Sequence, residues 1–234
     1  GRIAAFGRLI GAGWRLARND ALLPRELEEL YPPSILALSG TVRLLAGAEA
    51  RRGRPGERLA RSLEGLGPVA IKLGQLLSTR ADIFGVEFAE DLARLKDKLD
   101  PFPMEAARRE IEASLGQPVE ALFDDFGPPV AAASLAQAHR ARLKDGRAVA
   151  VKVLRPGITR RVGEDAEVLR LAARLVEKVS APARRLEPIA LAETVIKATE
   201  LELDLRLEAA GCDEMGEVMA RDGYMTAPKV VWPG

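Results

Sequence analysis

The sequence has 234 residues, of which 47% are hydrophobic and 29% charged, and its formal net charge is only +1. This near balance excludes proteins that hold nucleic acid through a strongly basic surface. The composition is typical of a soluble globular chain, so it excludes disordered and collagen-like proteins and allows a sizeable core. A single cysteine, Cys212, excludes an internal disulfide framework and favours a reducing compartment.

The first twenty residues predict a basic amphipathic helix. Apolar side chains recur at helical spacing, and arginines occupy other positions around the helix. Such a helix can lie on an anionic membrane surface, or it can pack by one face on its own protein, and the sequence leaves both interpretations open. No window reaches the roughly 18 uninterrupted apolar residues that a membrane-spanning helix needs. The recurring apolar positions are Ile3, Phe6, Ile10, Trp14 and Ala17.

The chain up to residue 116 predicts helices almost throughout. A helix over 34–50 is followed by a polar loop over 51–56, which contains two glycines and a proline. Helical periodicity then covers 57–99, with breaks at Gly67-Pro68 and Phe84-Gly85. A shorter helix over 104–115 is expected to end at Gly116, a residue type suited to a helix C-terminus.

Near residue 120 the pattern changes to short strands. Residues 138–143 and 148–154 predict two strands, and the Asp-Gly pair between them is a strong hairpin signal. Two long helices are predicted over 162–179 and 188–210. A final strand is predicted over 227–232.

A run of small residues precedes the predicted hairpin, and a lysine follows it. Small residues between two strands let the backbone come close to a phosphate, and a lysine on the next strand supplies a compact cation for the same phosphates. The lysine strand reads Val149-Ala150-Val151-Lys152, close to the Val-Ala-Ile-Lys of protein kinases. The alternative is an alanine-rich loop that serves close packing alone. The loop and its flanks are Val130, Ala131, Ala132, Ala133, Ser134, Leu135, Ala136, Gln137 and Ala138.

A kinase-type lysine needs an acidic partner on a helix. Residues 200–208 offer several acids, and the periodicity predicts one continuous helix there. On that helix Asp204 and Glu208 share a face, whereas Glu202 points elsewhere. The alternative is a solvated acidic surface.

The third element is a helical stretch around Lys72 and Gln75. These two residues are three apart and so face the same side of a helix, and Gly74 between them leaves room for close approach by another element. By itself the pattern indicates an amphipathic helix with an exposed lysine.

Together these segments resemble the UbiB/AarF atypical kinase-like family, which is associated with ubiquinone biosynthesis. The resemblance runs from about residue 59 to the end of the sequence and rests on four motifs in the family's order. Lys72, Gly74 and Gln75 match the Lys-x-Gly-Gln motif, and Ala131, Ala132, Ala133 and Ser134 match the alanine-rich loop. Lys152 matches the nucleotide-positioning lysine, and Glu202 with Asp204 matches the Glu-x-Asp motif. Glu208 matches the acid that is expected to pair with Lys152.

The resemblance implies an α+β, protein-kinase-like fold. Residues 117–234 would form the kinase-like N-lobe, a small antiparallel sheet with helices. Residues 1–116 would form a helical N-terminal extension that carries the Lys-x-Gly-Gln helix across the face where a protein substrate would dock. Lys72 and Gln75 would then meet Glu202 or Asp204. We expect a fragment with the C-lobe missing, because the sequence begins without a methionine and ends inside a strand-like run.

The resemblance also implies binding of ATP or ADP with Mg²⁺ through the alanine-rich loop and Lys152, in support of ubiquinone biosynthesis. It favours the handling of lipid precursors over protein phosphorylation. Catalytic residues and metal ligands are expected in the missing lobe, so we expect no nucleotide turnover by these 234 residues alone. The literal Asp125-Phe126-Gly127 precedes the loop and is interpreted as a coincidence. His139, the single histidine, is predicted to be structural, and Cys212 to be inert.

Expected partners are a nucleotide and ubiquinone-precursor lipids or other members of a biosynthetic complex, together with a membrane surface. The expected location is the cytoplasmic side of the bacterial inner membrane. Two alternatives are a non-catalytic, pseudokinase-like regulatory or scaffold module, and an unrelated helical protein of the membrane surface. The second would require all four motif matches to be accidental.

Overall fold

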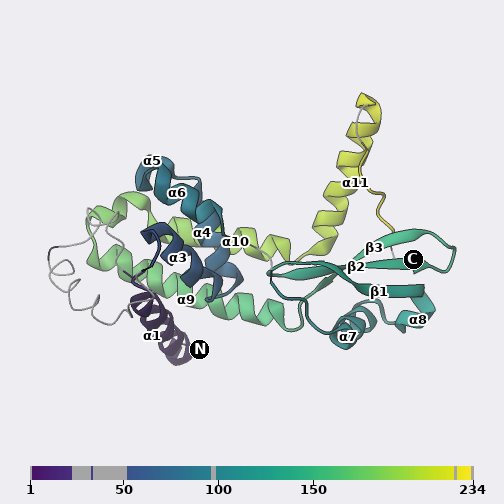
Figure 1. Ribbon diagram of the computed structural model, residues 1–234, viewed down its shortest axis with the longest axis horizontal. Helices are drawn as coiled ribbons and strands as arrows, with labels where there is room; N and C mark the ends of the chain where they lie inside the picture. Colours follow the sequence, from purple (N-terminus) through teal and green to yellow (C-terminus); the bar gives the residue numbers. More distant parts are fainter. Residues whose placement is uncertain (1, 23–32, 34–51, 96–98, 224–225, 233–234) are drawn as a thin grey trace. The chain divides into compact units, whose positions relative to one another are not determined.

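The computed structural model describes residues 2–22, 33, 52–95, 99–223 and 226–232 (Figure 1). The helix predicted over 34–50 lies outside these residues. The chain divides into two compact units, each made of two stretches of sequence. We call them the helical unit, Gly1–Asp97 with Thr159–Thr199, and the sheet unit, Lys98–Ile158 with Glu200–Gly234. The boundary expected at residue 116 stays a prediction.

The described residues of the helical unit form α-helices and a short 3₁₀ helix. Its core is apolar and lies among α3, α4 and α6, where Leu63, Phe88 and Leu92 are buried. The elements are α1 (Arg2–Arg18), α3 (Pro55–Glu64), α4 (Pro68–Ser78), α5 (Ala81–Phe84), α6 (Val86–Ala93), most of α9 (Ile158–Val179), η2 (Pro182–Leu186) and most of α10 (Pro188–Glu202).

The breaks predicted inside residues 57–99 are confirmed. Gly67 has a φ of +117° and Gly85 a φ of +82°, which are backbone conformations that side-chain-bearing residues rarely adopt. Pro68 is the first residue of α4, where its missing N–H costs no helical hydrogen bond. The same preference places Pro55 at the start of α3, so the polar loop predicted over 51–56 ends earlier than expected.

The sheet unit contains one antiparallel sheet with strand order β1-β2-β3, formed by β1 (Phe123–Ala132), β2 (Ala136–Leu143) and β3 (Ala148–Leu154). The predicted hairpin and the α+β class are therefore confirmed. Figure 1 shows α7 (Met104–Leu115) on one side of the sheet and α11 (Leu205–Asp222) on the other. A short helix, α8 (Val119–Leu122), leads into β1.

The core of the sheet unit lies between the sheet and α7. Ala107 and Ile111 of α7 pack with Phe126, Ala141 and Val153 of the three strands, and all five are buried. α7 ends as predicted, because the next residue adopts a left-handed conformation, with φ +69° at Gly116, and its N–H bonds to the carbonyl of Glu112.

The helix predicted over 188–210 is wrong as a single element. α10 ends at Glu202, and α11 begins at Leu205. Asp204 has an extended backbone, and its carboxylate accepts a hydrogen bond of 3.0 Å from the backbone N–H of Arg206. An aspartate in this position satisfies a backbone donor that a helix start leaves unpaired, so it begins a new helix where hydrophobic periodicity alone suggested continuity.

The strand predicted over 227–232 is also absent, since the described residues 226–232 form no regular element. This segment is instead held by α11. The carboxylate of Asp213 accepts hydrogen bonds from the backbone N–H of Val230 at 3.3 Å and from the indole Nε1 of Trp232 at 2.7 Å. The Cys212 thiol donates to the carbonyl of Pro228. Side chains of α11 thus provide partners that a neighbouring strand would otherwise supply.

Among the described residues, no helix is both long and apolar enough to cross a membrane.

One half-buried acid of the helical unit stands out. The Asp165 carboxyl is only 16% exposed, 3.6 Å from the Arg8 guanidinium and 3.8 Å from that of Arg161. Its Oδ2 has no hydrogen-bond partner among the described residues. Burial raises the pKa of Asp165 above its ordinary value, although the two arginines oppose the shift.

Gly74 of α4 is packed closely against side chains of its neighbours. A Cβ at this position would stand 2.7 Å from Cδ1 of Leu63 and closer still to Cδ1 of Leu95, and both leucines are buried. We predict that Gly74→Ala lowers the free energy of unfolding by about 1–3 kcal/mol through overpacking. Gly163→Ala on α9 is the matched control, because a Cβ there meets nothing within 4 Å, and it is expected to be neutral or stabilising. Thermal or urea unfolding of both variants measures the difference, and equal stability would contradict this packing.

The raised pKa of Asp165 predicts a pH dependence of stability. The folded protein holds this proton more tightly than the unfolded chain does, so this group's contribution to the free energy of unfolding falls as pH rises through the carboxyl range. Asp165→Asn removes that contribution. Urea unfolding between about pH 3 and pH 7 is expected to show that the free energy of unfolding of the variant increases, relative to that of the wild type, as pH rises. A difference that is constant or reversed with pH would refute the assignment.

Candidate functional site

The two faces of the sheet have different side chains. Along β3, Val149, Val151 and Val153 lie on the face toward α7, whereas Lys152 lies on the opposite face. In the antiparallel register, Ala138 is paired with both Ala131 and Lys152. Three of the predicted site residues, one from each strand, therefore lie side by side on the face away from the core.

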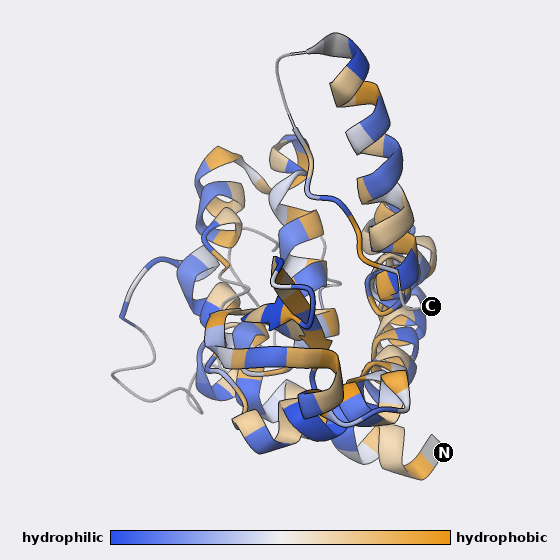
Figure 2. Ribbon diagram, turned by 90° about the vertical axis from the view of Figure 1, so that its right-hand side faces the viewer, coloured by the Kyte–Doolittle hydropathy of each residue, from blue (hydrophilic) through white to orange (hydrophobic). Residues whose placement is uncertain are grey.

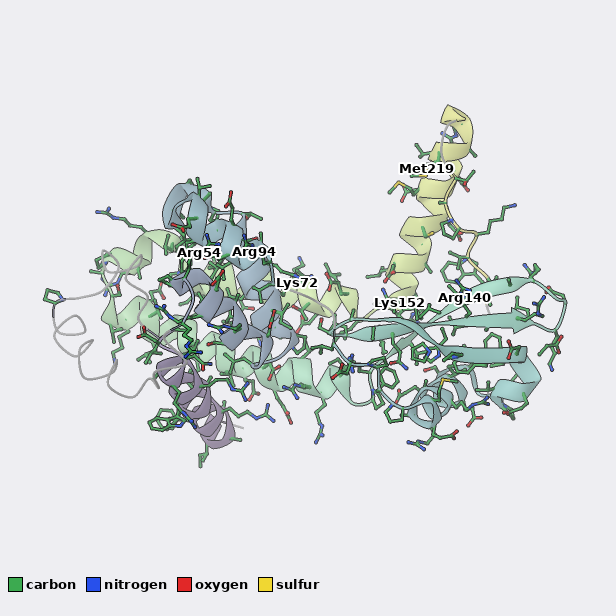
Figure 3. All side chains as sticks on the ribbon, in the orientation of Figure 1. Arg54, Lys72, Arg94, Arg140, Lys152 and Met219 are labelled. Atoms are coloured by element: carbon green, nitrogen blue, oxygen red, sulfur yellow. The ribbon has the colours of Figure 1, made fainter. Side chains whose placement is uncertain are left out.

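This face combines small and basic side chains. Ala150 pairs with Arg140 next to the pair of Ala138 and Lys152. Figure 3 shows Lys152 and Arg140 on this sheet. Alanines leave room above a sheet for a flat ligand, and the two cations favour an anionic one. Alternation along β3 predicts that Ala150 lies on the face of Lys152, but neither Ala150 nor Arg140 was among the site residues expected from the sequence.

The pairing predicted between Lys152 and Glu208 is present. Their side chains form an ion pair with a distance of 2.5 Å between Nζ and Oε2. Glu208 lies in the first turn of α11, one turn after the capping residue Asp204, so the helix start determines where this carboxylate lies. The two side chains are 46% and 57% exposed, which leaves the ammonium group accessible to a ligand. An exposed pair of this kind contributes at most about 1 kcal/mol to stability, so stability does not account for its presence.

The alanine-rich loop is a short connection between β1 and β2. Ala131 and Ala132 still belong to β1, and the turn covers 133–135 before β2 begins. The side chains of Ser134 and Leu135 are buried, at 6% and 7% exposure. A ligand at this loop would therefore meet its backbone. An open hollow of about 310 Å³ borders the end of β1, lined by Leu99, Pro101, Pro129, Val130, Ala131 and Ala132.

Gln137 and His139 lie on the core side of β2. The Gln137 amide accepts from the N–H of Phe102 at 2.9 Å and donates to its carbonyl at 3.2 Å. It also lies 2.9 Å from Nε2 of His139, whose Nδ1 lies 2.9 Å from the carbonyl of Gly127. The His139 ring, fully buried, stacks on Phe126. The structural role predicted for His139 is therefore confirmed, and the Gln137 side chain serves the same buried network.

The Asp125-Phe126-Gly127 run is part of β1, in agreement with its interpretation as a coincidence. Phe126 is a core residue, and the Gly127 carbonyl is engaged by His139. Among the residues that the structure describes, no group of three or more His, Cys, Asp or Glu side chains gathers around a common point.

The Lys-x-Gly-Gln residues belong to α4 of the helical unit. Lys72 and Gln75 are half-buried there, and Gly74 is the close-packing position described above. Glu202 and Asp204 belong to the sheet unit. The predicted approach of Lys72 and Gln75 to these two acids stays a prediction.

The helix break changes the interpretation of the Glu-x-Asp motif. Glu202 is the last residue of α10, and Asp204 caps α11, so the two acids do not share one helix as the periodicity suggested. The backbone N–H of Arg206, aided by its guanidinium, lowers the pKa of Asp204 below its usual value. Asp204 is thus held as a carboxylate by its own helix start.

Comparison with known proteins shows which proteins this chain is similar to. Residues 94–233 match the ABC1 atypical kinase-like domain. A protein named "Probable protein kinase UbiB" from Marinobacter nauticus is 40% identical over 229 residues, which cover 96% of this chain and 41% of the relative. Its namesake from Pseudomonas aeruginosa is 43% identical over 178 residues, covering 76% of this chain and 33% of the relative. The chain therefore spans about two fifths, or less, of the length of these relatives.

A solved structure, the complex of Rv3197 with erythromycin from Mycobacterium tuberculosis, is 28% identical and covers 73% of this chain and 44% of that one, with a TM-score of 0.42. The resemblance identified from the sequence motifs is confirmed by the match over 94–233 and by the two relatives. The chain belongs to the ABC1 atypical kinase-like family.

Proposed function

We propose that this chain carries the nucleotide-binding part of an atypical kinase- or ATPase-like protein that supports ubiquinone (coenzyme Q) biosynthesis. The observation that carries the proposal is the ion pair between Lys152 and Glu208, on a sheet face of small side chains beside the alanine-rich loop. Membership of the ABC1 family and relatives named as probable protein kinases support it.

The residues of the chain fit a nucleoside di- or triphosphate, ATP or ADP. The Lys152 ammonium would bind phosphate oxygens, and Glu208 would hold it in place. The backbone of the loop, with Ala131 and Ala138 beside it, would lie along the nucleotide. Bound Mg²⁺ supplies charge neutralisation at the phosphates in such proteins. The described residues gather no cluster of three or more His, Cys, Asp or Glu side chains that could hold it.

The family resemblance favours the handling of lipid precursors of ubiquinone, at the cytoplasmic side of the bacterial inner membrane, over the phosphorylation of proteins. Partners would then be those lipids or other members of a biosynthetic complex. The alternative is a non-catalytic regulatory or scaffold module. Such a module needs the fold but not the ion pair between Lys152 and Glu208. A measurement of nucleotide binding therefore distinguishes the two functions.

A membrane surface is part of the proposal because of α1. Ala5 and Ala17 are buried, whereas Ile3 is 92% exposed, Phe6 58% and Trp14 53%. The helix thus packs by one face and presents apolar side chains on another, and Figure 2 shows apolar residues along it beside the N mark. No acid occurs in α1, and Arg15 and Arg18 lie in its last turn. This combination suits an interface with anionic lipid.

Lys152→Ala is expected to weaken binding of a fluorescent ATP analogue with Mg²⁺ about tenfold or more, because a charged hydrogen bond to phosphate is lost. Lys144→Ala is the matched control, since Lys144 is an equally exposed lysine in the turn of the same hairpin, paired with Asp124 at 3.0 Å. Equilibrium titration of the intact protein measures both variants. If the two variants bind nucleotide with equal affinity, Lys152 is not part of the site. If the wild type does not bind nucleotide, the scaffold function is favoured.

The membrane contact predicts a change in Trp14 fluorescence. In a Trp232→Phe background, Trp14 is the remaining tryptophan. We expect its emission to shift to shorter wavelength with vesicles that contain phosphatidylglycerol, and less with phosphatidylcholine alone. Phe6→Ser is expected to weaken vesicle binding about tenfold or more, since a large apolar side chain no longer enters the lipid. An unchanged emission spectrum would show that α1 does not bind lipid.

A further inference from the structure

Arg155 follows β3 directly and binds the alanine-rich loop at both of its ends. Its Nε donates to the carbonyl of Ala133 at 2.8 Å, and its backbone N–H donates to the carbonyl of Leu135, also at 2.8 Å. Within the loop, the N–H of Ala133 bonds to the carbonyl of Ala136 at 2.8 Å. Three hydrogen bonds therefore fix the path of a turn that covers only 133–135.

The same guanidinium also holds the segment before α7. Its Nη2 donates to the carbonyl of Asp100 at 2.9 Å, and the group lies over the Phe102 ring, 5.5 Å from its centroid. The side chain of Gln137, on β2, holds the backbone of Phe102 by the two hydrogen bonds described above. The loop and residues 100–102 are thus joined to one another through Arg155.

This connection has a consequence for the hollow beside the loop. Leu99 and Pro101 line it from one segment, and the last residues of β1, Val130 to Ala132, line it from the other. Arg155 bonds to residues adjacent to both sets, Asp100 and Ala133. Arg155, together with Gln137, therefore links the two walls of the hollow. A lysine offers no planar fork, so it cannot donate in the same two directions at these positions.

We propose that Arg155 is a positioning residue of the nucleotide site. It holds the alanine-rich loop and residues 100–102 in a single arrangement, so the cradle for phosphate is formed before the ligand arrives. A preformed site saves the entropy of ordering a loop on binding, and the alanines of the loop act in the same direction, because their backbone is more restricted than that of glycine. This inference rests on the proposed function, and the test separates the two.

The test compares Arg155→Ala, Arg155→Lys and the control Arg147→Ala, whose arginine pairs with Asp145 in the β2–β3 turn of the same sheet. Hydrogen exchange of the backbone amides over 133–136 measures the loop without any ligand. We expect exchange to be at least about tenfold faster in Arg155→Ala, intermediate in Arg155→Lys and unchanged in Arg147→Ala, with the β2–β3 amides protected in all three. If Arg155→Ala does not fold, Arg155→Lys carries the comparison.

The second measurement is the affinity of the intact protein for ATP with Mg²⁺. We expect the affinity to fall about five- to fiftyfold in Arg155→Ala, and bound nucleotide to restore loop protection in part. A looser loop with unchanged affinity would overturn the positioning role while leaving the proposed function intact. Unchanged loop exchange would show that the Arg155 side chain does not hold the loop. Absence of binding by the wild type would overturn the proposed function, whereas the exchange data would still report whether Arg155 holds the loop.

Discussion

The alternation of side chains along three short antiparallel strands is the constraint on which the candidate site depends. On one face, valines and Phe126 pack against α7 and form the core of the sheet unit. The register then has to place Ala131, Ala138 and Lys152 together on the other face. A shift of one residue in this register would bury the lysine and expose the valines. The energy that stabilises the fold thus also determines which side chains are available to a ligand.

Polar groups on the core side reinforce this register. His139 and Gln137 are almost completely buried, and their hydrogen bonds tie β2 to β1 and to the segment before α7. Buried polar groups are costly when they are unpaired, so this network opposes any slip that would separate its members. Arg155 adds the same kind of constraint at the end of β3, where it joins the loop to residues 100–102. Hydrogen bonds therefore hold the loop at both of its ends.

The second determinant of the site is the start of α11. Asp204 lies between α10 and α11 and caps the start of α11, and Glu208 follows one helical turn later. The carboxylate that meets Lys152 is therefore placed by a capping residue rather than by a continuous helix. The same residue is part of the Glu-x-Asp motif, which gives that motif a local structural role in addition to the one expected from the family. Asp213, further along α11, accepts hydrogen bonds from Val230 and Trp232 of the irregular segment 226–232.

Sequence patterns were enough to predict the hairpin, the helix that ends at Gly116 and the breaks at Gly67 and Gly85, and the family resemblance predicted the pairing of Lys152 with Glu208. Each of these follows from local backbone chemistry or from the family motifs. The irregular path of 226–232 and the hydrogen bonds of Arg155 and Gln137 depend on tertiary structure, whereas the break at Asp204 comes from a local cap that hydrophobic periodicity does not reveal. Their partners, such as Ala133, Phe102 and the N–H of Val230, lie at other places in the chain. Periodicity records which face of an element is apolar, but it carries no information about which distant polar group will satisfy a given side chain.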